Sequence, residues 1–181
     1  MSSADVQLDR ISTKKMPTDI TTLHQWFCWQ DDGGEMQAIV PESGEPASSL
    51  ADATSLNEAR HVCETGDYDG VALVLNEELV GIRLLDVVEG SDYDPNIDDW
   101  AEEIICSINS YAEISHNEDD ILLLLEGELP TDAIDTERVE IASVGPIVPI
   151  TGRALDSSPG IQHRQDELEA LCEKCKQRDS I

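Results

Sequence analysis

Aromatic residues are scarce in this sequence of 181 residues, which contains three Trp, three Tyr and a single Phe. A hydrophobic core must therefore be built mainly from Leu, Ile, Val and Ala. Hydrophobic residues still make up 40% of the chain, which is enough for a core and argues against a random coil. The length suits one domain, or one domain with a small appendage.

Basic residues are the second shortage: 11 Lys and Arg stand against 39 Asp and Glu, giving a formal net charge of −28. Nucleic-acid binding needs basic stripes that neutralise phosphates, and the only adjacent basic pair is Lys14-Lys15. We therefore expect no strong direct binding of nucleic acid. An acidic, lysine-poor surface is typical of cytosolic proteins of halophilic microbes, because molar salt screens the self-repulsion. The alternative is an acidic protein that mimics DNA or binds a basic partner.

Long apolar runs are also missing, so the sequence predicts no membrane span, and its first 16 residues lack the apolar centre of a secretory signal. We expect a cytoplasmic protein. The cysteines are odd in number and scattered, which favours reduced thiols over a disulfide framework. They are Cys28, Cys63, Cys106, Cys172 and Cys175.

The pattern of apolar residues and turns predicts an α+β fold. Residues 1–20 are expected to be a flexible tail, 21–155 a domain, and 156–181 a linker and a helix. The expected strands are residues 25–29 and 36–40 as one hairpin, 71–75 and 79–88 as a second, then 111–115, 121–125, 139–142 and 147–150. The expected helices are residues 54–63 with Thr54 as N-cap, 98–109 and 165–177.

Several short phrases occur in an order that resembles the primase-polymerase domain of archaeo-eukaryotic primase type, as found in plasmids and viruses of halophilic archaea. The phrases are Leu79-Val80-Gly81-Ile82 followed by Asp86-Val87-Val88, Trp100-Ala101-Glu102-Glu103-Ile104, Ser110-Tyr111-Ala112-Glu113-Ile114-Ser115, Gly127-Glu128-Leu129-Pro130, Val139-Glu140-Ile141 and Thr151-Gly152-Arg153. The resemblance covers about residues 23–175. It implies an antiparallel or mixed sheet, with an RRM-like unit, flanked by helices.

The resemblance also implies a two-metal phosphoryl-transfer site, and the residues for it are replaced. The family's first motif reads Gly-Ile-Asp-Leu-Asp-Asp, whereas this chain has Arg83 and Leu85 at the two ligand positions after Gly81. Arg83 would repel a divalent cation and Leu85 offers no donor. Asp86 is retained, but strand alternation would turn it to the opposite face.

The second and third family motifs have also changed. The second is a glycine-rich phosphate turn with a His, and here Ser115 is kept while Glu118 and Asp120 replace the glycines and Leu122 replaces the His. The third motif keeps its acidic residue as Glu140, and Thr151 and Gly152 remain. Its Arg aligns with Pro146. Loss at all three motifs predicts that the chain is not an enzyme of this family and needs no cofactor.

Other candidate sites have weaker support. The acidic loop with Asp86, Glu89, Asp92 and Asp94 could hold a cation, and Cys172 with Cys175 could bind zinc with His61 and Cys63. We interpret the acidic loop as solvated and the cysteines as ordinary thiols. His116 is expected to be a solvated loop residue, and Trp26 and Trp29 to be packing residues rather than a base-stacking platform.

Three hypotheses follow. The first is a non-catalytic primase-polymerase relative that binds a replication protein or another basic protein. The second is an active nucleotidyltransferase that holds Mg²⁺ or Mn²⁺ through Asp86, Glu113 and Glu140. The third is a DNA mimic or inhibitor that binds a basic protein. None of them involves a membrane.

Overall fold

The computed structural model describes residues 11–91, 94–130, 132–145, 147–156 and 158–178. These residues form two compact units, each traced by two stretches of the chain. Unit 1 contains the chain up to Val74 together with Ile147–Gly152. Unit 2 contains Leu75–Pro146 and Arg153–Ile181. These boundaries differ from those expected at residues 20 and 155, because the strand at Ile147–Ile150 pairs within unit 1.

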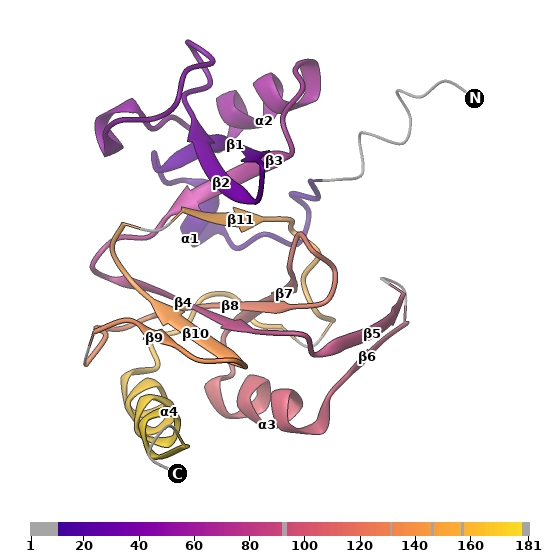
Figure 1. Ribbon diagram of the computed structural model, residues 1–181, viewed down its shortest axis with the longest axis vertical. Helices are drawn as coiled ribbons and strands as arrows, with labels where there is room; N and C mark the ends of the chain where they lie inside the picture. Colours follow the sequence, from indigo (N-terminus) through magenta and orange to yellow (C-terminus); the bar gives the residue numbers. More distant parts are fainter. Residues whose placement is uncertain (1–10, 92–93, 131, 146, 157, 179–181) are drawn as a thin grey trace. The chain divides into compact units, whose positions relative to one another are not determined.

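Unit 1 has a four-stranded sheet at its centre, with strand order β11-β3-β1-β2 and antiparallel pairing throughout (Figure 1). Its elements are α1 (Thr18–Thr21), β1 (Trp26–Asp32), β2 (Glu35–Ile39), the 3-10 helix η1 (Leu50–Asp52), α2 (Leu56–Thr65), β3 (Gly70–Val74) and β11 (Ile147–Ile150).

The first expected hairpin is confirmed, since β1 pairs antiparallel with β2. Gly33 and Gly34 turn the chain with φ angles of 69° and 97°, which glycine adopts at low cost. The helix expected after residue 54 is also confirmed as α2. Its N-cap, however, is Ser55 rather than Thr54, because the Ser55 hydroxyl accepts a hydrogen bond from the Glu58 amide at 3.3 Å.

The tryptophans of unit 1 are packing residues, as expected: Trp26 is 0% exposed and Trp29 is 8% exposed. The indole N–H of Trp26 donates to the Ile20 carbonyl at 3.1 Å, which ties α1 to β1. Met16 and Ile20 are buried although they lie in the range expected to be a flexible tail. Residues 1–10 of that range lie outside the described residues.

Unit 2 has a five-stranded sheet with strand order β7-β8-β4-β10-β9, again antiparallel throughout, and a separate two-stranded ribbon of β5 and β6. Its elements are β4 (Leu79–Leu84), β5 (Val88–Ser91), β6 (Asp94–Ile97), α3 (Asp99–Ile108), β7 (Tyr111–Ile114), β8 (Ile121–Glu126), β9 (Ile134–Asp135), β10 (Val139–Ala142) and α4 (Gln165–Arg178).

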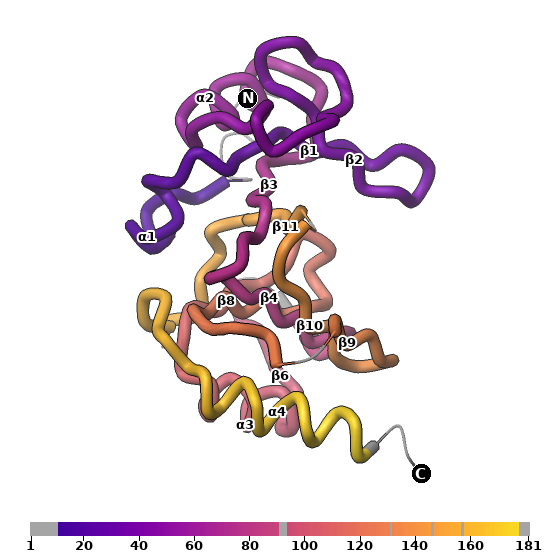
Figure 2. The backbone as a smooth tube through the Cα atoms, turned by 90° about the vertical axis from the view of Figure 1, so that its left-hand side faces the viewer, coloured from indigo at the N-terminus to yellow at the C-terminus, as the bar shows by residue number. Residues whose placement is uncertain are grey.

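Both helices of unit 2 lie on the same side of its sheet, as Figures 1 and 2 show from two directions. They cover the main core, to which every second residue of the strands contributes. The fully buried strand residues of this core are Val80, Ile82 and Leu84 of β4, Ile121, Leu123 and Leu125 of β8, Ala112 of β7 and Ile141 of β10. The residues that alternate with these core positions, Arg83 among them, face the other side of the sheet.

The α+β class is therefore confirmed, with mostly antiparallel pairing, but one expected pairing is wrong. Residues 71–75 and 79–88 do not form a hairpin. β3 lies between β11 and β1 in unit 1, whereas β4 lies between β8 and β10 in unit 2. Both strands are central, so each already has partners on both sides and neither has a free edge for the other.

The acidic stretch after β4 was expected to be a loop and forms the ribbon of β5 and β6 instead. Gly90, with a φ of 103°, bends close to the Asp94 carbonyl, where a side chain would collide. Only its base packs against the core, through the partly buried Val88 and Ile97, so no long alternation of apolar residues marked it in the sequence. Among the described residues, no helix is both long and apolar enough to cross a membrane.

Candidate functional site

The candidate site is a row of side chains on the sheet face of unit 2 that α3 and α4 do not cover. Strand register places Glu113 opposite Leu122, Leu122 opposite Arg83, and Arg83 opposite Glu140. Directly opposed residues share a face, so all four side chains lie on one side of the sheet. Arg83 and Glu140, which the resemblance aligns with the first and third family motifs, are thus neighbours on this face.

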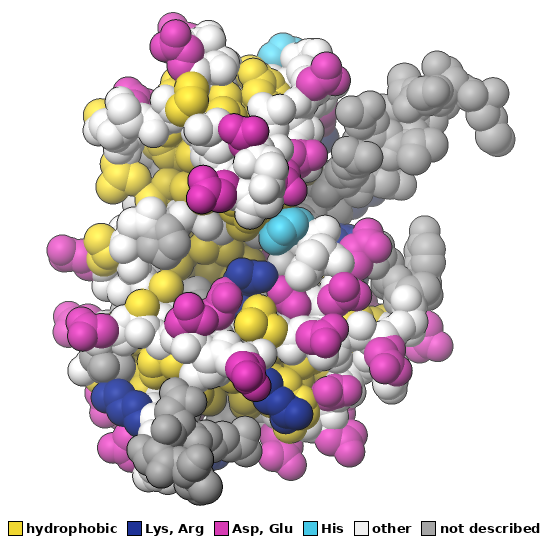
Figure 3. Space-filling model, in the orientation of Figure 1, with side chains coloured by type: hydrophobic (Ala, Val, Ile, Leu, Met, Phe, Trp, Pro, Cys, Tyr) yellow, Lys and Arg dark blue, Asp and Glu magenta, His cyan; other side chains and the backbone are white. Residues whose placement is uncertain are grey.

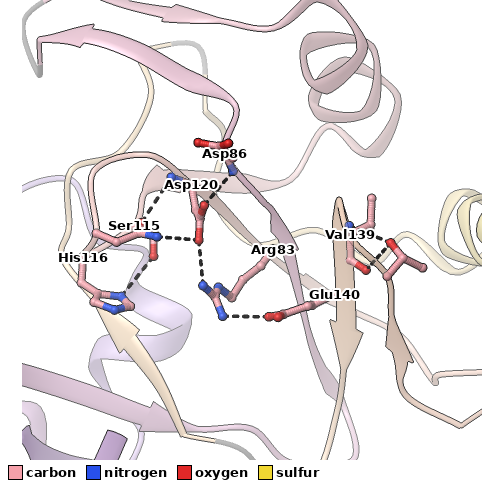
Figure 4. Close-up of polar contacts among 9 residues, drawn as sticks. Arg83, Asp86, Ser115, His116, Asp120, Val139 and Glu140 are labelled. Atoms are coloured by element: carbon pink, nitrogen blue, oxygen red, sulfur yellow. Dashed lines mark hydrogen bonds and ion pairs between the residues drawn. The ribbon is translucent and has the colours of Figure 1, made fainter. Parts of the chain in front are cut away.

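Arg83 points between two carboxylates and binds both of them (Figure 4). Its Nη1 is 2.7 Å from Oε2 of Glu140, and its Nη2 is 2.7 Å from Oδ2 of Asp120. These are charge-assisted hydrogen bonds at their usual short length. The Arg83 side chain is 34% exposed and Glu140 37%, but Asp120 only 5%, so the pair with Asp120 is the more shielded from water.

Asp120 is held by more than Arg83. Its Oδ1 accepts a hydrogen bond from the Asp86 amide at 2.8 Å, and its Oδ2 accepts one from the Asn117 side chain, also at 2.8 Å. The Asp120 amide in turn donates to Oδ1 of Asn117. The buried carboxylate therefore joins the end of β4 to the turn between β7 and β8, and its oxygens already have donors.

The turn between β7 and β8 contains the residues that the resemblance aligns with the second family motif. The Ser115 amide donates to the Asp120 carbonyl at 2.9 Å, which closes the turn. Glu118 adopts a φ of 70°, in the left-handed region that favours glycine. Arg153 donates to the Ser115 carbonyl and pairs with Glu118 at 3.4 Å. His116 lies beside Ser115, with its Nδ1 3.2 Å from the Ser115 hydroxyl.

Asp86 was expected to turn away from Arg83 by strand alternation, and this argument was wrong. β4 ends at Leu84, and Asp86 has a left-handed backbone with a φ of 56°. Its side chain is exposed while its amide binds Asp120. Leu85 is half-buried and its amide donates to the Arg138 carbonyl at 2.9 Å.

The electrostatics of the cluster follow from its composition. One guanidinium is placed between two carboxylates, so the positive charge that a divalent metal would supply is already present as part of the chain. The oxygens that face it are occupied by its hydrogen bonds. Among the described residues, no group of three or more His, Cys, Asp or Glu side chains is arranged to hold a metal ion.

Glu113, a ligand in the hypothesis of an active enzyme, lies on the same face but far from Glu140. Three strand-to-strand steps separate them, which is roughly 14 Å, with Leu122 and Arg83 between. Glu113 is 0% exposed and accepts a hydrogen bond from the Tyr111 hydroxyl at 2.7 Å. Burial, and then the charge of Glu113, raises the pKa of Tyr111 above its usual range.

The other retained or replaced motif positions have structural roles. Leu122 is 1% exposed between Arg83 and Glu113, where a histidine would have no access to solvent. Gly81 packs against Leu75, and a Cβ there would lie 3.1 Å from the Leu75 Cδ1. Gly152 of unit 1 has a φ of 71° and approaches the Ser12 backbone so closely that no side chain fits. Next to it, the Thr151 carbonyl accepts from the Ser12 amide at 3.0 Å.

The weaker candidate sites do not form a metal-binding group within the part of the chain that the structure describes. Cys172 and Cys175 are buried in the core of unit 2, whereas Cys63 is buried in unit 1 against Cys28. Burial raises the pKa of Cys172, which disfavours the thiolate that zinc requires. In the acidic stretch, Glu89 and Asp94 are exposed, and Asp92 lies outside the described residues. Pro146, the position aligned with the family's Arg, lies outside them as well.

Comparison with known proteins does not assign a family. No protein-family model matches the sequence, and no curated protein is significantly similar to it. The primase-polymerase resemblance therefore rests on the short sequence motifs alone.

Proposed function

We propose that this chain is a non-catalytic relative of primase-polymerase domains, acting as an accessory or interaction protein in the replication of a halophilic archaeal mobile element or virus. The observation that carries the proposal is the contact of Arg83 with Asp120 and Glu140, at 2.7 Å each. The guanidinium stands at a motif position where the family has a metal ligand, and it binds the acidic residue that the third motif retains.

Loss of catalysis follows from the charge and the geometry of that contact. Two-metal phosphoryl transfer needs carboxylates that converge on cations about 3.5–4 Å apart. Here the Glu140 oxygen facing the site is hydrogen-bonded to Arg83, and both oxygens of Asp120 are in use. A cation approaching these oxygens would meet the guanidinium at short range and would have to displace it.

Descent from the family is supported by positions that shape the backbone. Glu118 has a left-handed conformation at the place where the second family motif has a glycine. In unit 2, an antiparallel sheet with two helices on one side agrees with the RRM-like unit that the resemblance implies. These features are what a degenerate copy would keep, since they determine the fold rather than the reaction.

The competing hypothesis of a displaced metal site has less support. Glu113 and Glu140 are roughly 14 Å apart across the sheet, too far to share one ion or a closely spaced pair. Asp86 is exposed at the end of β4. Arg83 lies between Glu113 and Glu140, and its positive charge would repel a cation there.

The partner class follows from charge. Asp and Glu side chains are spread over the face of the molecule in Figure 3, whereas Lys and Arg are few. With a formal net charge of −28, the surface disfavours contact with phosphates and favours contact with basic side chains, at the short range that molar salt leaves unscreened. A replication protein with a basic surface suits this requirement.

A primer-synthesis assay tests the absence of catalysis. The chain is incubated with template, nucleotides and Mg²⁺ or Mn²⁺ in molar KCl, beside the variant Glu140→Gln. We expect no incorporation by either protein. Incorporation by the wild-type chain that is absent from Glu140→Gln would contradict the proposal.

Affinity capture in molar KCl tests the partner class, with an unrelated protein of similar negative charge as the control bait. We expect specific capture of a replication protein that stays bound when duplex DNA is added. A partner that duplex DNA displaces would instead support the DNA-mimic hypothesis, because the two would then compete for one basic surface.

A further inference from the structure

Two buried cysteines of unit 1 lie in contact although they are far apart in sequence. Cys28 is in β1 and is 0% exposed, and Cys63 is in α2 and is 6% exposed. Their sulfur atoms are 2.9 Å apart. Both are free thiols, and neither takes part in the Arg83 cluster of unit 2.

Each of the two sulfurs also lies within hydrogen-bonding distance of a backbone carbonyl. The Cys63 sulfur is also 3.0 Å from the Gly70 carbonyl, and the Cys28 sulfur is 3.4 Å from the Ala59 carbonyl. Each thiol has a single hydrogen to donate. Cys63 can donate its hydrogen either to the Cys28 sulfur or to the Gly70 carbonyl, while Cys28 donates to the Ala59 carbonyl. The separation exceeds the length of a disulfide bond, about 2.05 Å, by less than an ångström.

We propose that Cys28 and Cys63 are an oxidation site, at which a peroxide converts the two thiols into a disulfide that links β1 to α2. In the first step the Cys63 thiolate attacks one peroxide oxygen, forming a sulfenic acid and releasing hydroxide. In the second step the Cys28 thiolate attacks the Cys63 sulfur, forming the S–S bond and releasing a second hydroxide. The two thiol protons and the two hydroxides give two waters, so hydrogen peroxide is reduced as the thiols are oxidised.

The order of the two steps follows from exposure. Cys63 retains some contact with solvent and Cys28 has none, so the oxidant reaches Cys63 first. The hydrogen bond with Cys28, followed by burial, raises the pKa of Cys63. Thiolate is therefore scarce at neutral pH, and oxidation is slow unless α2 moves away from the sheet.

The other cysteines provide internal comparisons. Cys106 is exposed on α3 and would react with peroxide or with a second chain without stabilising any pair of elements. Cys172 and Cys175 are three residues apart on α4, so a bond between them would close only a very short loop. A bond between Cys28 and Cys63 spans 35 residues and restricts the unfolded chain far more.

The test uses the full chain with Cys106→Ser, which leaves four thiols and prevents cross-linking between molecules. The folded protein is treated with hydrogen peroxide, the oxidant is removed, and remaining thiols are alkylated after denaturation. We expect two alkylated cysteines instead of four, a linked peptide that contains Cys28 and Cys63, and full reversal by dithiothreitol.

Thermal unfolding of the same samples measures the consequence. The disulfide should raise Tm by about 10 °C, and this shift should be absent from a Cys63→Ala variant in the same background. Four alkylated cysteines, sulfinic acid without a link, or a link between Cys172 and Cys175 alone would overturn the proposal. The peptide analysis does not depend on any variant of the pair, and neither result bears on the function proposed for the Arg83 cluster.

Discussion

The two faces of the sheet in unit 2 are built from alternating residues of the same strands, yet they differ in kind. On β4, Ile82 is fully buried in the core beneath α3 and α4, while the next residue, Arg83, joins two carboxylates on the opposite face. On the first face, every second residue along the strands points into the core, and hardly any of these residues is polar. The second face also buries Leu122 and Leu124, but it has an ion-pair cluster where the resemblance implies a metal centre.

The difference indicates which face of the sheet stabilises the fold and which face could carry out chemistry. The helix-covered face obtains its free energy from apolar burial, which tolerates no polar replacement. On the other face, Arg83 pairs with carboxylates that would hold a metal ion under the proposed descent. A domain of this kind can therefore lose its reaction and keep its fold.

The largest effect is expected on the apolar face. Ile82→Ala leaves a cavity in the core and should lower the free energy of unfolding by about 4 kcal/mol. Urea unfolding in molar KCl measures it. A loss below about 1 kcal/mol would mean that this face is not the main source of stability.

On the polar face, Asp120→Ala should lower the free energy of unfolding by about 2–3 kcal/mol, because it removes three hydrogen bonds and leaves Arg83 with one carboxylate. Asp119→Ala is the matched control, since that neighbouring side chain is exposed. If both variants lost the same free energy of unfolding in urea, Asp120 would not be the central residue of the cluster.

The elements themselves were largely predictable from the sequence. The hairpin at β1 and β2, the helix α3 and the buried strand β8 all have the expected periodicity or turn residues. The pairing of β3 with β4 was mispredicted because short, fully apolar strands carry no information about their partners. The ribbon of β5 and β6 was missed because each strand has too few apolar residues for a visible alternation.

The candidate site was predictable only in part. The motifs placed Arg83 and Glu140 at one site, but not Asp120, which was interpreted only as a replacement for a glycine of the phosphate turn. Nothing in the spacing of residues 83 and 120 shows that their side chains meet, because β4 and β8 are separated in sequence by the ribbon, α3 and β7. The one available signal was an Arg and an Asp that both replaced motif residues.

A third effect is a pH dependence of stability at Tyr111, which donates to Glu113 at the other end of the site from Glu140. Burial raises the pKa of Tyr111, so the folded chain keeps this proton after the unfolded chain has lost it near pH 10. The contribution to stability is complete below that pH and falls above it by about 1.4 kcal/mol per pH unit. Tyr111→Phe should lack this part of the slope in urea unfolding between pH 9 and 11. An unchanged slope would contradict the burial of a neutral hydroxyl beside Glu113.

The smallest effect is expected at Glu140, whose side chain is 37% exposed. Glu140→Gln keeps an oxygen that accepts from Arg83, and solvent already weakens the ion pair, so the loss should stay below about 1 kcal/mol. Urea unfolding measures it beside Asp120→Ala. A loss as large as that of Asp120→Ala would mean that both carboxylates hold Arg83 equally.

The most direct test of the ion-pair cluster as a replacement for a metal centre is a Mn²⁺ titration in molar KCl, followed by thermal unfolding. Non-specific binding to the acidic surface should affect the wild-type chain and Glu140→Gln alike, so we predict the same Tm change for both at every concentration. A specific site would stabilise the folded state as RT ln(1 + [L]/Kd). A saturable rise in Tm for the wild-type chain that Glu140→Gln lacks would contradict the account.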